Sequence, residues 1–183
     1  ATPTSGGSIS LSGKTENGGD GYFGFSLEYG QTVTAWGPII VYGQVAPVNT
    51  ANWWTLADTQ VGIGTSLCSP VRSFNSSVTV TGYSSGSTGL QIVGGAPVTT
   101  ATALTLTAIG SEGQGFLLSD SLVAGGDITI DARIARPDVM GMYMSVANKT
   151  IWSTAGNIRI TVDSKGPGAD LRSPILAGNS ATP

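Results

Sequence analysis

Histidine is absent from this chain of 183 residues, and cysteine occurs once, as Cys68. Metal centres built on histidine or several cysteines, imidazole acid–base catalysis and CxxC redox chemistry are therefore excluded within one chain. Because Cys68 has no intrachain partner, we expect either a buried thiol or a bridge to a second chain. These absences predict a protein that is not an enzyme and that needs no cofactor or metal.

Charge is also scarce, with 10% charged residues and a formal net charge of -3. The eight lysines and arginines are scattered, which argues against direct nucleic acid contact. There is no apolar run of the roughly 18 to 20 residues that cross a membrane, and the N-terminus has neither a charged nor an apolar leader region. We expect a mature, soluble chain without a membrane span.

The chain does contain 27 glycines and 40% hydrophobic residues, in a pattern that alternates apolar and polar side chains. In residues 127–134, for example, Ile128 and Ile130 alternate with Asp127 and Thr129. This period of two is typical of half-buried strands, and glycine-rich turns separate the segments that show it. The strands expected on this basis cover residues 8–12, 23–29, 31–35, 39–42, 78–81, 90–93, 104–108, 127–134, 140–146 and 158–163.

About eight to ten short strands without a detectable repeat predict an all-β chain, folded as a single β-sandwich or jelly roll. We expect the body of the sandwich to span residues 13–172, with extended arms at residues 1–12 and 173–183, which are rich in small and polar residues. Helix is expected at most as a short turn in residues 49–60.

Catalytic and metal-binding motifs are weak. Residues 82–86 match the G-x-S-x-G pattern of hydrolases, but without histidine Ser84 lacks the usual base, so the segment is interpreted as a turn. Acidic residues near 17–20 and 120–127 could hold calcium, although capping of turns is the simpler interpretation.

Aromatic residues and sequons provide candidate contacts with glycans. Trp53 and Trp54 are adjacent, so on a strand one would be displayed and could stack on a sugar or pack at a subunit interface. Asn75 and Asn148 begin N-x-S/T sequences and are candidate N-glycosylation sites.

The N-terminal arm contains a possible donor strand. Ile9 and Leu11 alternate with serines after a Gly-Gly pair, so the segment could complete the sheet of a neighbouring subunit. It could equally be the first edge strand of its own sheet.

These features favour a structural protein that assembles with copies of itself. The first hypothesis is the subunit of an extracellular or cell-surface filament or pilus, which polymerises by strand addition and apolar packing. The alternative is a virion structural protein, such as a jelly-roll capsid, spike or decoration subunit. The third is a carbohydrate-binding module that uses Trp53 or Trp54.

Overall fold

The structure is a computed structural model that describes residues 6–15, 22–45, 62–111 and 113–178. Within these ranges the chain forms β-strands and turns without helix, and the strands belong to three sheets of six. Sheet A contains β1 (Ile9–Thr15), β4 (Ile39–Val45), β7 (Val78–Ser84), β10 (Leu104–Gly110), β13 (Ile128–Ile134) and β16 (Ile158–Ser164). Sheet B contains β2 (Tyr22–Leu27), β5 (Gly62–Leu67), β8 (Leu90–Ile92), β11 (Phe116–Leu118), β14 (Met142–Met144) and β17 (Ala169–Asp170). Sheet C contains β3 (Val33–Ala35), β6 (Val71–Ser73), β9 (Val98–Thr100), β12 (Leu122–Ala124), β15 (Ile151–Ser153) and β18 (Ile175–Ala177).

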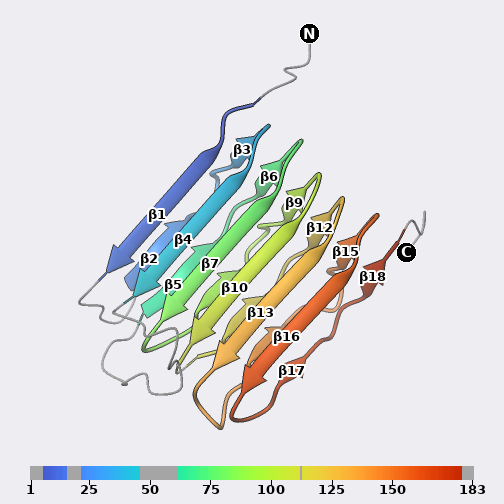
Figure 1. Cartoon of the computed structure of the whole chain (residues 1–183). Coiled ribbons are helices and arrows are strands. Elements are labelled where there is room, and N and C mark those ends of the chain that lie inside the picture. The colour runs from blue at the N-terminus through green and yellow to red at the C-terminus, as the bar shows by residue number, and fades with distance from the viewer. Residues whose placement is uncertain (1–5, 16–21, 46–61, 112, 179–183) are drawn as a thin grey trace.

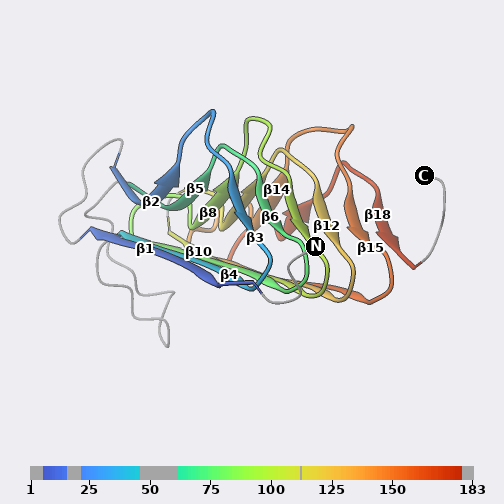
Figure 2. The same ribbon diagram turned by 90° about the horizontal axis from the view of Figure 1, so that it is seen from above.

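The chain winds through the three sheets in strict rotation. Each coil consists of one long strand of sheet A followed by one strand of sheet B and one of sheet C (Figure 1). Every strand pairs in parallel with the equivalent strand of the next coil, as β10 does with β7 and β13. Sheet A forms one flat side, and sheets B and C close the other sides (Figure 2). The fold is a β-solenoid of about five turns.

The expected β-sandwich or jelly roll of eight to ten strands is therefore wrong, because the described residues form 18 strands in a solenoid. The all-β class is right, and each of the ten expected segments overlaps an observed strand. In a sandwich and in a solenoid alike, one face of each strand packs against the core and the other faces water. The alternation of apolar and polar residues along a strand is therefore the same in both. The difference lies in the pairing, because each strand here bonds to a segment one full coil away. The assumption that the chain has no repeat also fails, because the coil is the repeat.

The core lies between the sheets and is built from aliphatic ladders. The first and third residues of each sheet A strand point inward, and in the interior coils they are buried isoleucine, valine or leucine. Leu104, for example, lies in register between Val78 and Ile128, and all three are fully buried. Equivalent inward positions stacked one coil above another exclude water along the solenoid axis.

A column of glycines marks the line where sheet B approaches sheet A. One glycine stands in each coil at the equivalent position, either as the third residue of β2 and β5 or directly before the first residue of β8, β11, β14 and β17. A Cβ atom on Gly89 would lie 2.5 Å from the backbone nitrogen of Ile109 in the next coil. Only glycine allows this approach of two backbones. The column contains Gly24, Gly64, Gly89, Gly115, Gly141 and Gly168.

Candidate functional site

The two ends of the solenoid differ from its interior in burial. Inward side chains of β7 and β13 are fully buried at alternate positions, whereas those of β1 and β16 are half-buried. Each interior strand is covered by a coil on both sides, and each terminal strand by a coil on one side. The ends therefore leave a core cross-section and a row of backbone donors and acceptors open, within the residues that the structure describes.

Ile9 and Leu11, the predicted donor-strand residues, lie at the N-terminal end. Both lie in β1, which pairs in parallel with β4 of its own chain from Ile9 to Thr15. Their side chains pack partly against the core, together with Phe25 and Leu27 of β2. This pairing uses one of the two edges of β1, so the addition of β1 to a neighbouring subunit stays a prediction.

The C-terminal end is apolar as well. Ile158, Ile160 and Val162 of β16 are half-buried against the core. Leu171 and Ile175 in the same coil have 39% and 40% of their surface exposed. This terminal coil thus leaves aliphatic side chains partly exposed, whereas water-facing terminal coils of solenoids normally carry polar residues.

Gly168 is exceptional within the glycine column. A Cβ atom on Gly24, Gly64, Gly89, Gly115 or Gly141 would clash with atoms of the next coil, whereas one on Gly168 would meet nothing within 4 Å. The reason is topological, because the coil of Gly168 is the last one that the structure describes. This end thus keeps the small residue that accommodates a following coil, where the described residues supply none.

The charges at the two ends are opposite on the outer face of sheet A. Lys14 of β1 and Asp163 of β16 occupy the same position of their strands, in a ladder that also contains Gln44, Tyr83, Ile109 and Arg133. Arg133 donates to Asp131 at 2.6 Å, and this bond is the largest contribution to its raised pKa, with Asp163 adding to it. The ladder therefore presents a cation at one end and an anion at the other.

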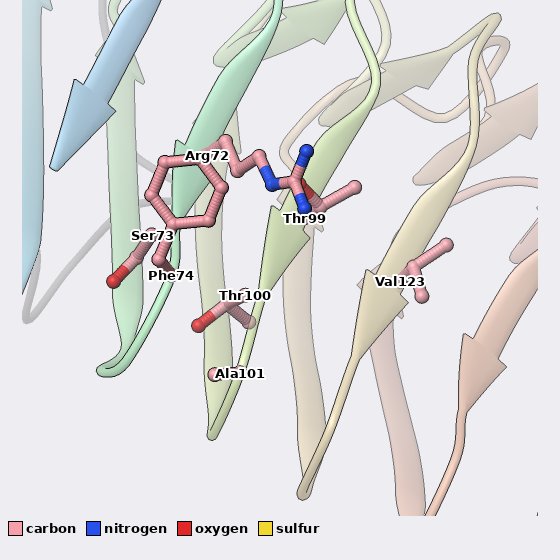
Figure 3. A pocket seen from close by; sticks show the side chains of 7 residues that line it. All are labelled: Arg72, Ser73, Phe74, Thr99, Thr100, Ala101 and Val123. Carbon is pink, nitrogen blue, oxygen red and sulfur yellow. The ribbon is translucent and has the colours of Figure 1, made fainter. Parts of the chain in front are cut away.

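A hollow of about 390 Å³ lies on the outer face of sheet C. Arg72 and Phe74 form one side, and Thr99, Ala101 and Val123 continue it over the next two coils (Figure 3). The outward residues Arg72, Thr99 and Val123 are direct register neighbours. Beyond them in the same ladder stands Trp152, whose indole donates to the carbonyl oxygen of Gly178 at 3.3 Å.

The other predicted residues are placed as follows. Trp53 and Trp54 lie outside the described residues. Asn75 and Asn148 are both exposed in turns between strands. Cys68 is buried as a free thiol, 3.5 Å from the Ser66 hydroxyl.

The G-x-S-x-G segment is a turn, as expected. The Ser84 hydroxyl donates to the Gly62 carbonyl and accepts from the backbone nitrogens of Gly86 and Ser87, so it is occupied in shaping the end of β7.

The acidic residues of 120–127 bond to protein groups, although the buried Oδ2 atom of Asp120 has no hydrogen-bond partner among the described residues. Asp120 accepts from Lys149 at 3.2 Å, and Asp127 accepts from the backbone of Asn157 at 2.8 Å. Residues 17–20 lie outside the described part. Among the described residues there is no group of three or more histidine, cysteine or acidic side chains that could hold a metal ion.

Sequence reasoning missed the open ends, the glycine column and the hollow of sheet C. The column had a signal, because glycines recur at positions 64, 89, 115, 141 and 168, which are almost evenly spaced. The hollow had none, since Arg72 and Val123 become neighbours only through parallel pairing over two coils.

Comparisons with protein-family models, curated proteins and solved structures found no match. Within the described residues, no helix is long and apolar enough to cross a membrane.

Proposed function

We propose that this chain is a non-enzymatic structural protein that stacks head to tail with copies of itself into an extracellular filament. The observation that carries the proposal is the pair of open, matching ends, with Gly168 keeping space for a coil that the described residues do not supply. In the stack, β16 of one copy pairs with β1 of the next, and sheets B and C continue in the same way. Assembly is thus strand addition with apolar packing, driven by open edges and apolar burial.

The ladders of the two ends are compatible when they are joined in register. Ile158 and Ile160 would lie over Ile9 and Leu11 of the next copy, which extends the aliphatic ladders of the core. Val162 would lie over Gly13 of the next copy, where the absence of a side chain on glycine leaves room for the valine. On the outer face, Asp163 would lie between Arg133 and the next copy's Lys14, which favours this register over a shifted one.

The geometry of the contact favours a filament over a closed particle. The contact joins two different surfaces, so it is heterologous, and each copy leaves one end open for the next. Continuation of the parallel sheets adds copies along the solenoid axis. Asn75 and Asn148 are exposed in turns, so both sequons would be accessible to N-glycosylation in an extracellular protein.

A substitution at Gly168 tests the proposal without disturbing the subunit. Gly168→Val should leave the fold and melting temperature unchanged, because no atom of the described residues beyond its chain neighbours lies within 4 Å of a Cβ atom at this position. It should abolish assembly, since the side chain would clash with β1 of the next copy. Ala147→Val, at an exposed turn, is the matched control and should assemble normally. Sedimentation velocity against concentration measures both.

A charge exchange tests the register. Lys14→Asp or Asp163→Lys alone should raise the concentration needed for assembly about twofold to fivefold at low salt, the range for exposed ion pairs. The double variant should recover much of the loss, and Thr107→Lys, on the same face of an interior strand, should have little effect. A wild-type protein that stays monomeric at all concentrations, or normal assembly of Gly168→Val, would refute the proposal.

A further inference from the structure

The hollow on sheet C is lined by the planar guanidinium of Arg72, the aromatic ring of Phe74 and the smaller side chains of Thr99, Ala101 and Val123. The Arg72 guanidinium lies 4.3 Å from the centroid of the Phe74 ring. Phe74 in turn packs against Trp36, with ring centroids 5.0 Å apart, and keeps 36% of its surface exposed. The stack holds the guanidinium with one face covered, which leaves the N–H groups at its edge free to donate in the plane.

Arg72 has no acidic partner among the described residues. The ion pairs there join Arg133, Arg136, Lys149 and Arg172 to aspartates, and none involves Arg72. Its side chain extends from β6 toward Thr99 on β9, at the side of the hollow (Figure 3). A fixed guanidinium with an unmatched charge is suited to bind a carboxylate through two parallel hydrogen bonds.

A ligand in the hollow can bind to side chains but not to the backbone N–H and C=O groups of the strands beneath it. The backbone of β6, β9 and β12 is paired within sheet C, and Ala101 continues the ladder with a bond from its nitrogen to the Ser73 carbonyl. A peptide therefore cannot bind here by adding a strand, which needs a free edge. The ligand must be recognised by the Arg72 guanidinium, the Phe74 ring and the Thr99 hydroxyl.

We propose that this hollow binds a sugar that carries a carboxylate. Such a sugar has an anionic group for Arg72, hydroxyl groups for Thr99 and C–H groups that can contact the part of Phe74 that stays exposed beside the stacked guanidinium. The single arginine matches one carboxylate, whereas a phosphate backbone requires several cations along its path, and the net charge of -3 further disfavours such a polyanion. Interior coils line the hollow, away from both ends of the solenoid, so the site does not depend on the proposed assembly.

The test is an NMR titration with matched pairs of small sugars. Methyl glycosides of glucuronic acid, galacturonic acid and N-acetylneuraminic acid are the probes, and the methyl glycosides of glucose and galactose are the neutral counterparts. At least one acidic probe should shift the resonances of the Arg72 side chain and of Phe74, and the neutral sugars should bind at least about tenfold more weakly, as expected for a lost charge-assisted bond.

Variants separate the site from nonspecific attraction. Arg72→Gln should weaken binding of the acidic sugar about tenfold or more. Arg72→Lys should bind it more tightly than Arg72→Gln but less tightly than the wild type, because lysine restores the positive charge without the planar guanidinium that forms two parallel hydrogen bonds. Phe74→Leu should weaken acidic and neutral sugars alike. Arg159→Gln, which removes an exposed arginine from sheet A, is the control and should bind as the wild type does.

Three results would overturn the inference. The first is that none of the acidic probes binds, and the second is equal binding by Arg72→Gln and the wild type. The third is tighter binding of a single-stranded oligothymidylate than of any acidic sugar at the same residues, which would identify a nucleic acid site instead.

Discussion

The interior coils and the terminal coils of this solenoid have the same sequence pattern but differ in what covers them. The inward residues of β10 are fully covered, whereas those of β16 are half-covered. Gly89 and Gly168 belong to the same glycine column, but backbone of the next coil covers Gly89, whereas none of the described residues covers Gly168. The difference shows that the burial of a residue in a solenoid depends on the neighbouring coil, so a coil covered on one side only leaves its inward side chains half-exposed.

The largest expected effect concerns the core ladder. Leu106 in β10 is fully buried, so Leu106→Ala should lower the free energy of unfolding by about 3 to 5 kcal/mol, through lost burial and a cavity. Leu11→Ala in β1 should cost clearly less in the monomer, because Leu11 is already half-exposed. Urea denaturation at a concentration where the protein is monomeric measures both. Equal losses would show that the ends are as well covered as the interior.

The glycine column gives a second comparison. Gly89→Ala should destabilise the fold by about 1 to 3 kcal/mol or more, because the added methyl group meets backbone that cannot move aside easily. Gly168→Ala should be neutral, or slightly stabilising through reduced freedom of the unfolded chain. Thermal unfolding of the two variants measures both changes in stability. A loss for Gly168→Ala comparable to that for Gly89→Ala would remove the argument for free space at that end.

Cys68 provides a probe of whether the interior opens. Its thiol is buried in the corner that follows β5, so a thiol reagent should label it slowly in the native protein and quickly in denaturant. The labelling rate should be nearly unchanged by Leu11→Ala at the end and should rise in Leu106→Ala. Rapid labelling of the native wild type would contradict the burial of Cys68.

The smallest effect is expected at alkaline pH. Burial, and then the neighbouring Tyr42, raise the pKa of Tyr83 above its ordinary value of 10.0, while Arg133 lowers it and Asp131 raises it. The folded protein then keeps a proton that the unfolded chain loses, so the contribution of Tyr83 to stability is constant below about pH 10 and falls as the pH rises further. Tyr83→Phe should reduce this fall. Denaturation between pH 9 and pH 11 measures it, and an unchanged slope would exclude Tyr83 as a source.

Individual strands could be predicted from the sequence because their signal is local. Residues 158–163 were predicted to be a strand from alternation alone, and β16 covers Ile158–Ser164. The pairing could not be predicted in the same way, because the step along the chain from a residue to its partner varies. Leu104 pairs with Ile128, whereas Ile39 pairs with the much more distant Val78. Coils of unequal length conceal the repeat in a scan for one fixed period.

The candidate sites were harder to predict than the strands, because most of them are formed by residues that only the pairing of strands brings together. Ile9 and Leu11 were identified from their alternation, and the structure places them at an open edge. Lys14 and Asp163 could not be related, because their common ladder exists only once all strands of sheet A are in register. The same holds for Arg72 and Val123, which approach each other only through the coils of sheet C.

Head-to-tail stacking has a direct signature in the axial repeat of the assembled filament. Six strands per sheet at the strand spacing of about 4.8 Å predict one subunit per roughly 29 Å along the axis, with strands running across it. Electron cryomicroscopy of the native assembly measures this repeat. An axial rise that matches this value, with continuous parallel sheets, would support the account, whereas closed shells, dispersed monomers, or filaments joined through the sheet faces would contradict it.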